Sequence, residues 1–484
     1  MDRRALLRSV LAVPIGAAAV SMLPRPGLAG EPSGAMPSGP KIPYRLKTEA
    51  KQIAPFGAET RALLANGTWP GTELRFSKGE DFGVLVENAM DQPTTLHWHG
   101  LILPNLQDGV PGITQAPIPP GEALFYEFRL RQTGTYWYHS HVGLQLQQGL
   151  SGPLIIEDPD EPYGYDEDLV VYLSDVINAA PDEAMQKLLT DKMDVSVSDP
   201  YGNPDGSAFA TDVPYDGLLL NGKSGQEPWT KAVKPGSRVR LRLINASGST
   251  YFRVALDGLT MQVIAADGEP IAPVEVENLV LATAQRYDVL VTVPSGGAHT
   301  IHAAALGLDK QALGVLHSSD AEPAVNRKRP AFAGPGLAVE TLASPYETIL
   351  PKAPDKTFEI KLSGNMQRYL WQMNGVSWPE AFVTFKGITI EESFYDVQLG
   401  DVVRFDLVNE TPMVHPMHLH GHVFRVLQEG QDPATAPVRD TVSVPPRGKV
   451  SIEFLADNPG KWFWHCHNVW HLAAGMAQGV RYVI

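Results

Sequence analysis

The sequence predicts an all-β protein with several sandwich domains, and its composition, its strand pattern and its length support that prediction. Glycine (44 residues) and proline (41 residues) are abundant in the chain of 484 residues, and charged residues make up only 19% of it. The apolar runs are short and are bounded by residues that favour turns, which is typical of strands. At about 150 residues per domain, the length predicts roughly three domains.

The first residues are typical of an export signal. Arg3 and Arg4 form a twin-arginine pair ahead of an apolar stretch over residues 10–23. A membrane anchor is the alternative, but the stretch is short for a span and contains Pro14. We therefore expect a cleaved twin-arginine-type signal peptide over residues 1–29, a periplasmic mature protein and no membrane segment after cleavage.

The remaining chain divides by composition and pattern. Regular structure is expected to start near Ile53, and one helix is expected from Pro181 to Met193 in an otherwise strand-like pattern. The expected parts are a flexible mature N-terminus over 30–50, domains over 51–160, 161–320 and 356–484, and a proline-rich linker over 321–355.

Composition also limits the partners. A formal net charge of −15 excludes nucleic acid as an expected partner, because phosphates repel an acidic surface. Cys466 is the single cysteine, so the chain has no internal disulfide. In an exported protein such a thiol is either inert or has a specific role.

The surroundings of Cys466 favour a specific role. His465 and His467 flank it, His471 follows five residues later, and Met476 follows ten residues later. A thiolate, imidazoles and a weak axial thioether are the ligands of a blue-copper centre. A buried structural cysteine beside chance histidines is the alternative, and three further histidine clusters argue against it.

Those clusters belong to an internal repeat. His97-Trp98-His99-Gly100 has its counterpart in His418-Leu419-His420-Gly421, and His139-Ser140-His141 has its counterpart in His465-Cys466-His467. The strand-like segments before each cluster also correspond. A repeat of this quality indicates that the first and third domains are homologous.

Aligning the two repeats separates two kinds of site. His415, Cys466, His471 and Met476 fall opposite Thr94, Ser140, Gln145 and Leu150, so the blue-copper set is expected in the third domain alone. The His-x-His pairs occur in both domains. Alternate residues of a strand face opposite sides, and eight imidazoles exceed the needs of one ion, so we expect a cluster of several coppers between the domains. Cys466 then joins the two sites covalently.

The motifs H-W-H-G, H-S-H, H-P-M-H-L-H-G and H-C-H-N-V-W-H-L-A-A-G-M resemble those of the multicopper oxidases, the family of laccases and periplasmic cuprous oxidases. The resemblance implies three consecutive cupredoxin-like Greek-key β-sandwich domains and four copper ions. It implies His415, Cys466, His471 and axial Met476 at type 1 copper; His97 and His418 at type 2 copper; and His99, His139 and His467 with His141, His420 and His465 at the two type 3 coppers.

The resemblance also implies a reaction. One-electron oxidation of a reducing substrate at type 1 copper is coupled, through Cys466, to four-electron reduction of dioxygen to water at the trinuclear cluster. Asp108, eleven residues after His97, resembles the family's proton donor near type 2 copper. A turn-forming Asp before Gly109 is the alternative. The segment after H-C-H carries no carboxylate, which leaves a second acidic relay in doubt.

The sequence leaves two hypotheses for the identity of the reducing substrate. A phenolic or other aromatic reductant, as for laccases, is the first hypothesis, and a cuprous ion, oxidised for copper tolerance, is the second. Met413 and Glu410 are candidate contacts for a cuprous ion, with core packing as the alternative for Met413. A non-enzymatic copper-binding protein and a two-copper nitrite reductase fit the full ligand set less well. We expect a monomer, because its own domains create the cluster interface.

Overall fold

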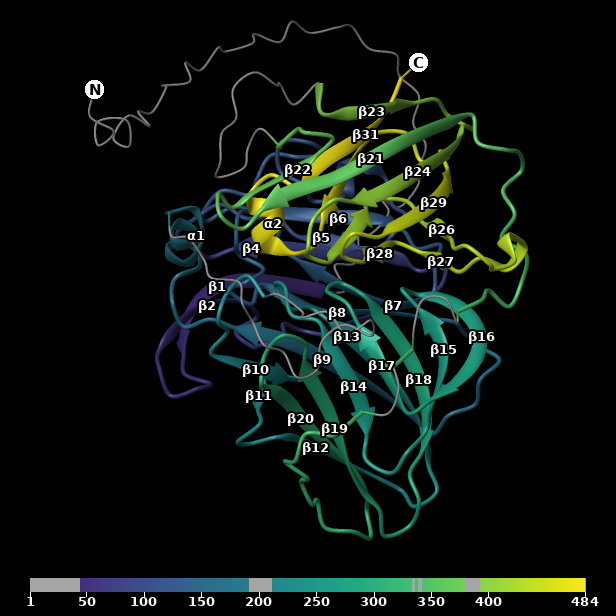
Figure 1. Cartoon of the computed structure of the whole chain (residues 1–484). Coiled ribbons are helices and arrows are strands. Elements are labelled where there is room, and N and C mark those ends of the chain that lie inside the picture. The colour runs from purple at the N-terminus through teal and green to yellow at the C-terminus, as the bar shows by residue number, and fades with distance from the viewer. Residues whose placement is uncertain (1–43, 191–210, 333–335, 338–341, 379–391, 484) are drawn as a thin grey trace, which may run out of the picture. The chain divides into compact units, whose positions relative to one another are not determined.

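The computed structural model confirms the all-β fold class (Figure 1). It describes residues 44–190, 211–332, 336–337, 342–378 and 392–483. The expected signal peptide over 1–29 lies outside these residues, as does the segment 30–43. Within the described ranges, no helix is long and apolar enough to cross a membrane.

The strands form three pairs of sheets, which we call the first, second and third sandwiches. The first sandwich has a sheet of order β2-β1-β4-β6 and a sheet of order β3-β8-β7-β5. Its strands are β1 (Tyr44–Ile53), β2 (Thr60–Ala65), β3 (Leu74–Ser77), β4 (Asp81–Asn88), β5 (His97–His99), β6 (Ala123–Arg129), β7 (Gly134–His139) and β8 (Ser151–Glu157).

The first strand corrects one expectation. β1 begins at Tyr44 and pairs in parallel with β4, from Tyr44 opposite Val84 to Thr48 opposite Asn88. Leu46 and Thr48 are fully buried. The expectations of a flexible segment up to residue 50 and of regular structure only from Ile53 are therefore wrong, because the apolar and small side chains facing inward secure this segment in the sheet.

The second sandwich has a sheet of order β11-β10-β9-β13-β18-β15-β16 and a sheet of order β12-β20-β19-β14-β17. Its strands are β9 (Glu167–Val176), β10 (Gly217–Leu220), β11 (Lys223–Ser224), β12 (Trp229–Val233), β13 (Arg238–Asn245), β14 (Phe252–Leu256), β15 (Met261–Ala266), β16 (Glu269–Val276), β17 (Asn278–Leu281), β18 (Arg286–Thr292), β19 (Ala298–Ala305) and β20 (Gln311–Ser318). The expected helix forms as α1 (Pro181–Thr190), and residues 191–193 lie outside the described ranges.

The third sandwich has a sheet of order β22-β21-β24-β29-β26-β27 and a sheet of order β23-β31-β30-β25-β28. Its strands are β21 (Lys356–Asn365), β22 (Leu370–Met373), β23 (Phe394–Val397), β24 (Val402–Asn409), β25 (His415–Leu419), β26 (Phe424–Leu427), β27 (Val438–Arg439), β28 (Thr441–Val444), β29 (Lys449–Leu455), β30 (Lys461–Cys466) and β31 (Ala477–Tyr482). Two short helices, η5 (Pro433–Thr435) and α2 (Val469–Ala473), connect them.

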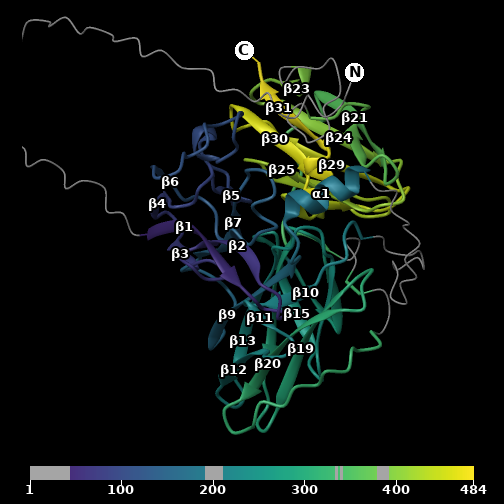
Figure 2. The same ribbon diagram turned by 90° about the vertical axis from the view of Figure 1, so that its left-hand side faces the viewer.

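The apolar cores explain how the motifs are brought together. One continuous core includes side chains of both the first and third sandwiches, among them Trp98 of β5 and Trp464 of β30. A second core lies within the second sandwich. Figure 2 shows β25 and β30 beside β5. Burial of apolar surface between the first and third sandwiches thus places the ligand-bearing strands of both at one interface.

Candidate metal centres

Eight buried or largely buried histidines form one cluster at this interface, and we call it the eight-histidine cluster. In the first sandwich, β5 and β7 pair His97 with His139. In the third sandwich, β25 and β30 pair His418 with His465. The members are His97, His99, His139, His141, His418, His420, His465 and His467. The structure therefore brings together all four His-x-His pairs that the sequence singled out.

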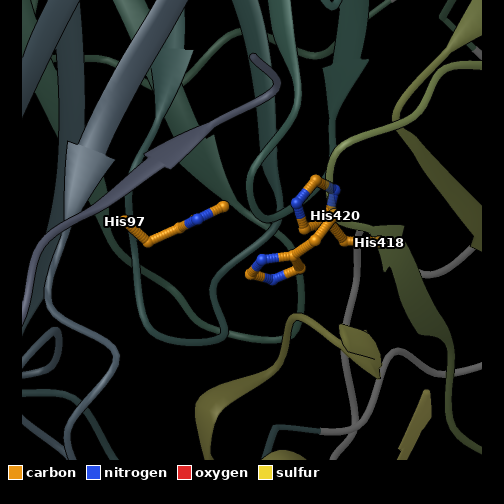
Figure 3. Close-up of side chains that lie close together, drawn as sticks. All are labelled: His97, His418 and His420. Carbon is orange, nitrogen blue, oxygen red and sulfur yellow. The ribbon is translucent and has the colours of Figure 1, made fainter. Parts of the chain in front are cut away.

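Rings from different sandwiches meet within this cluster. His97 stacks on His420 with ring centroids 3.9 Å apart, and His99 stacks on His418 with centroids 3.8 Å apart. Figure 3 shows His97 approaching His418 and His420 from the opposite strand. Each sandwich alone holds half of the cluster, so the site depends on their association.

The hydrogen bonds of the imidazoles follow a pattern. Most histidines donate an outer Nδ1–H to an oxygen: His97 to Asp108 O (2.8 Å), His139 to Ser140 O (3.0 Å), His418 to Asp440 O (2.9 Å), His465 to Cys466 O (2.9 Å) and His420 to Asp108 Oδ2 (2.9 Å). The inner Nε2 atoms of His97, His139, His141, His418 and His467 have no hydrogen-bond partner among the described residues. A buried nitrogen without a partner is costly, and a metal ion would satisfy it.

Burial keeps seven of these imidazoles neutral. It lowers the pKa of His465 to about 3, and it lowers the pKa values of His99, His139, His141, His418, His420 and His467 well below the usual range. Repulsion between neighbouring imidazoles acts in the same direction. A neutral imidazole with a free lone pair is the form that binds copper, so the donor set fits this metal.

A second site, which we call the thiol site, consists of His415, Cys466, His471 and Met476. The Nδ1 atoms of His415 and His471 lie 3.0 Å apart, and Cys466 Sγ lies 3.8 and 3.6 Å from them. The Cys466 amide donates to Met476 O at 3.0 Å, so the two residues are neighbours through their backbones, and Met476 is fully buried. Burial raises the pKa of Cys466, so the thiolate requires a bound cation. The converging sulfur and nitrogens fit copper.

Local structure orients the ligands of the thiol site. Asn468 caps α2 and places His471 in its first turns. The outer Nε2 of His415 contacts Thr411 Oγ1 at 2.8 Å. Trp371 of β22 packs on the His471 ring with centroids 4.0 Å apart. These contacts fix both rings, so the arrangement of the donors does not depend on a bound ion.

The second sandwich contributes a carboxylate that the sequence did not reveal. Asp212, which is 1% exposed, accepts from His471 Nε2 at 3.1 Å, from Tyr369 OH at 2.6 Å and from Asn468 Nδ2 at 2.6 Å. Burial alone would raise the pKa of Asp212, but its hydrogen bonds with His471, Tyr369 and Asn468 lower the pKa overall. No motif surrounds Asp212, so no signal in the sequence could have identified it.

Asp108 lies where the sequence expected it, beside the histidines. It follows the short helix η2 (Asn105–Gln107), is 0% exposed, and contacts His420 Nδ1 through Oδ2 at 2.9 Å. Its Oδ1 lies 3.2 Å from His97 Nδ1. Gly109 adopts φ +82° against Leu96, so Asp108 also precedes a tight turn. The carboxylate therefore adjoins the cluster and is not only a turn residue.

Other candidates stay outside both sites. His422, which the sequence places two residues after His420, is buried beyond the end of β25, and its Nε2 lies 2.7 Å from Tyr482 OH. His299, His302 and His317 of the second sandwich each contact oxygen atoms of their own surroundings. Met413 is 3% exposed within the apolar core. Residues 379 and 380, which the sequence suggests lie near the thiol site, are outside the described residues.

An all-β fold that holds a thiol–imidazole site next to an eight-histidine cluster defines a copper-dependent redox protein. Three family models, each described as multicopper oxidase, match residues 47–161, 170–321 and 351–483. The chain belongs to the multicopper oxidase family. It is therefore a copper-dependent oxidoreductase that uses dioxygen as its electron acceptor.

Individual relatives agree with that assignment. The chain is 34% identical to multicopper oxidase MmcO of Mycobacterium tuberculosis, over 92% of this chain and 88% of the relative. It is 30% identical to the copper resistance protein A homolog of Pseudomonas syringae pv. tomato, over 96% and 98%. The crystal structure of a laccase from Botrytis aclada superposes with a TM-score of 0.75 and 29% identity, over 90% of this chain and 87% of that chain.

Proposed function

We propose that the chain holds four copper ions. The type 1 ion would bind to His415, Cys466, His471 and axial Met476; the type 2 ion to His97 and His418; and the type 3 ions to His99, His139 and His467 and to His141, His420 and His465. The observation that carries this proposal is the set of inward-facing nitrogens without partners in the described chain. Two sets, His415-Cys466-His471 and His141-His420-His465, also have all donor atoms within 4.8 Å of one another.

Cys466 serves both sites in this proposal. Bound copper would supply one-electron oxidation of the reductant at the thiol site and four-electron reduction of dioxygen at the cluster. Peptide bonds join Cys466 directly to His465 and His467, while β25 pairs Met417 with Cys466 and His418 with His465. The chain thus connects the two sites by the shortest covalent route available to it.

Asp108 is proposed as the proton donor of the cluster. Reduction of dioxygen to water consumes protons, and a buried site needs a positioned group to deliver them. Asp108 contacts imidazoles of both sandwiches, His97 and His420, and no solvent reaches its side chain. Its carboxyl group would therefore hold a proton beside the cluster, where bound copper would supply the reduction of dioxygen.

Asp108→Asn tests this role. The amide keeps the size of the side chain but cannot release a proton, so we expect turnover to fall by about 10²–10⁴-fold. The blue absorption of the thiol site should stay unchanged, because Asp108 contacts only the cluster. Oxygen-uptake rates and visible spectra of the same preparation measure both quantities. Unaltered turnover would contradict the proton role.

A phenolic or other aromatic reductant is the proposed substrate. A cavity of about 680 Å³ lies between the second and third sandwiches and is lined by Tyr251, Val280, Leu306 and Val414, among others. Val414 directly precedes ligand His415. Tyr251 OH lies 2.7 Å from Ser443 Oγ, and Ser443 pairs with Pro416. The size and the largely apolar lining suit an aromatic ring next to the thiol site.

A cuprous ion is the second candidate substrate, because the relatives include copper resistance proteins. The side chains that the sequence suggested for it do not converge. Met413 is in the apolar core, while Glu410 is half exposed, with Oε1 4.0 Å from Lys361 Nζ. These positions favour core packing for Met413 and weaken a cuprous site built from this pair.

Oxygen uptake with a phenol and with cuprous ion as donors, at matched concentrations, compares the two candidates. Val280→Trp, which fills the proposed cavity, should raise KM for the phenol by about tenfold and leave cuprous oxidation unchanged. Thr292→Trp, at an exposed end of β18, is the matched control. Equal kinetics of Val280→Trp and the control with the phenol would contradict the cavity assignment.

We further propose export and a monomeric state. The twin-arginine pair supports delivery to a periplasm, with cleavage at the end of residues 1–29. The two halves of the cluster come from one chain, which supports a monomer. N-terminal sequencing of the mature protein and light scattering measure these properties; an uncleaved N-terminus or a dimer mass would contradict them.

A further inference from the structure

Asp440 is a fully buried carboxylate between β27 and β28 that touches the eight-histidine cluster. Its Oδ1 lies 3.2 Å from His99 Nε2 and accepts from Thr441 Oγ1 at 2.8 Å. Its backbone oxygen accepts from His418 Nδ1 at 2.9 Å. One residue of the third sandwich thus binds the outer nitrogens of two histidines that come from different sandwiches.

His99 differs from its neighbours in the nitrogen that faces inward. In His97, His139 and His418, Nδ1 donates outward and Nε2 is left without a partner in the described structure. In His99, Nε2 contacts Asp440, and Nδ1 is the atom without a described partner. A carboxylate only accepts, so it holds the proton on Nε2 and leaves the Nδ1 lone pair free.

Arg286 of the second sandwich holds Asp440 in place. Its Nη1 and Nη2 donate to Asp440 Oδ1 and Oδ2 at 2.9 and 2.6 Å, a two-pronged contact of high geometric specificity. Its Nε donates to Thr135 O of the first sandwich at 3.0 Å. Arg286 is fully buried and therefore joins all three sandwiches beside the cluster.

The backbone next to His99 is adapted to this ion pair. Gly100 adopts φ +89°, and a Cβ atom there would lie 2.5 Å from Asp440 Oδ2 and 2.7 Å from Arg286 Nη2. The glycine of the H-W-H-G motif therefore leaves room for the carboxylate and the guanidinium. Any other residue at position 100 would place its Cβ atom against the ion pair and disrupt it.

We propose that Asp440, held by Arg286, is a positioning residue that makes Nδ1 the metal-binding nitrogen of His99. Through this contact the second sandwich, to which no copper ligand is assigned, controls the geometry of the cluster. The inference rests on the ligand assignment proposed above. It assigns to Asp440 and Arg286 a role beyond holding the sandwiches together.

A purely structural ion pair is the competing explanation, and the chain supplies a matched control for it. Arg425 of β26 and Glu453 of β29 form a largely buried pair within the third sandwich, with Nη2 2.7 Å and Nε 3.0 Å from Oε2. None of the contacts described for this pair involves Arg286, Asp440 or a histidine of the cluster. Breaking it should cost stability without affecting His99.

Asp440→Ala tests the inference. The substitution removes the oxygen that His99 Nε2 faces, so the carboxylate no longer holds the proton on Nε2 and the tautomer whose Nδ1 carries the proton becomes accessible. Loss of such a supporting contact typically weakens metal binding by about 10–100-fold. Copper titration of the copper-free protein, with metal analysis and the visible spectrum, should show weakened binding of copper at the cluster and an intact blue site.

Arg425→Lys should keep the wild-type copper affinity of the cluster, and equal weakening in both variants would overturn the inference. If Asp440→Ala does not fold, Arg286→Lys decides, since it keeps the charge but loses the two-pronged contact; unchanged cluster affinity would then overturn it. Wild-type protein that lacks blue absorption or cluster copper would instead refute the ligand assignment itself.

Discussion

The first and third sandwiches use the same positions in opposite ways. In the third, the side chains of His415, Cys466 and His471 converge. The two Nδ1 atoms lie 3.0 Å apart, and Cys466 Sγ lies 3.8 and 3.6 Å from them. In the first, the aligned residues form a hydrogen-bonded triad: Thr94 Oγ1 and Ser140 Oγ each lie 2.7 Å from Gln145 Oε1.

The difference shows what converts a structural position into a metal site. The hydroxyls and the amide of the first sandwich satisfy one another, and Gln145 Nε2 donates to Pro93 O at 2.8 Å. In the third sandwich, the outer nitrogens of His415 and His471 contact Thr411 and Asp212, so their inner nitrogens face each other and the thiol. Only a bound cation satisfies such a set fully.

Cys466→Ser should have the largest effect, because it gives the third sandwich the hydroxyl that the first has in Ser140. We expect complete loss of the blue absorption and of turnover, since the thiolate is lost. The cluster histidines should still bind copper, which metal analysis would detect. A variant that remains blue would show that the thiol site is assigned wrongly.

Acid should affect the thiol site and the triad of the first sandwich differently, because only the thiol site contains ionisable side chains. Burial lowers the pKa of His415 well below the usual range, so below pH about 6.5 the unfolded chain binds a proton that the folded copper-free protein excludes. Stability therefore falls as pH falls. His415→Gln should reduce this loss by about 1.4 kcal/mol per pH unit in urea unfolding of copper-free protein. An unchanged pH slope would contradict this account.

Ser140→Ala should break the triad of the first sandwich without affecting copper. Ser140 Oγ also accepts from Val142 N at 3.1 Å, so the substitution leaves buried polar groups unpaired. We expect a loss of about 1–3 kcal/mol in the free energy of unfolding, with unchanged copper content. Thermal unfolding and metal analysis measure these effects; copper loss would show that the triad supports the cluster.

Met476→Leu should have the smallest effect, because the first sandwich has Leu150 at this position. Met476 is fully buried beside the Cys466 amide. Removal of a weak axial thioether should leave the protein blue and raise the potential of the thiol site. Redox titration of the blue absorption gives the direction, and a lowered potential would argue against axial ligation by Met476.

The sequence alone determined the fold class and the composition of both candidate sites. Strand-length apolar runs between turn residues predicted the all-β fold, and the repeat placed His97 and His418 in equivalent positions. Such signals are local, since a strand pattern or a His-x-His pair is contained in a few consecutive residues. The repeat also aligned Thr94, Ser140 and Gln145 with His415, Cys466 and His471, and in the structure these three residues form the triad described above.

Only the tertiary structure decided which groups support those ligands. Asp212 and Arg286 belong to the second sandwich and lie in no histidine motif. Asp212 contacts ligand His471 directly, and Arg286 contacts Asp440, which in turn contacts His99. Asp440 acts through the nitrogen of His99 that faces away from the cluster. The sequence shows which residue types are present, but the ligating nitrogen of each imidazole depends on the oxygen opposite it, and the packing of three sandwiches sets that contact.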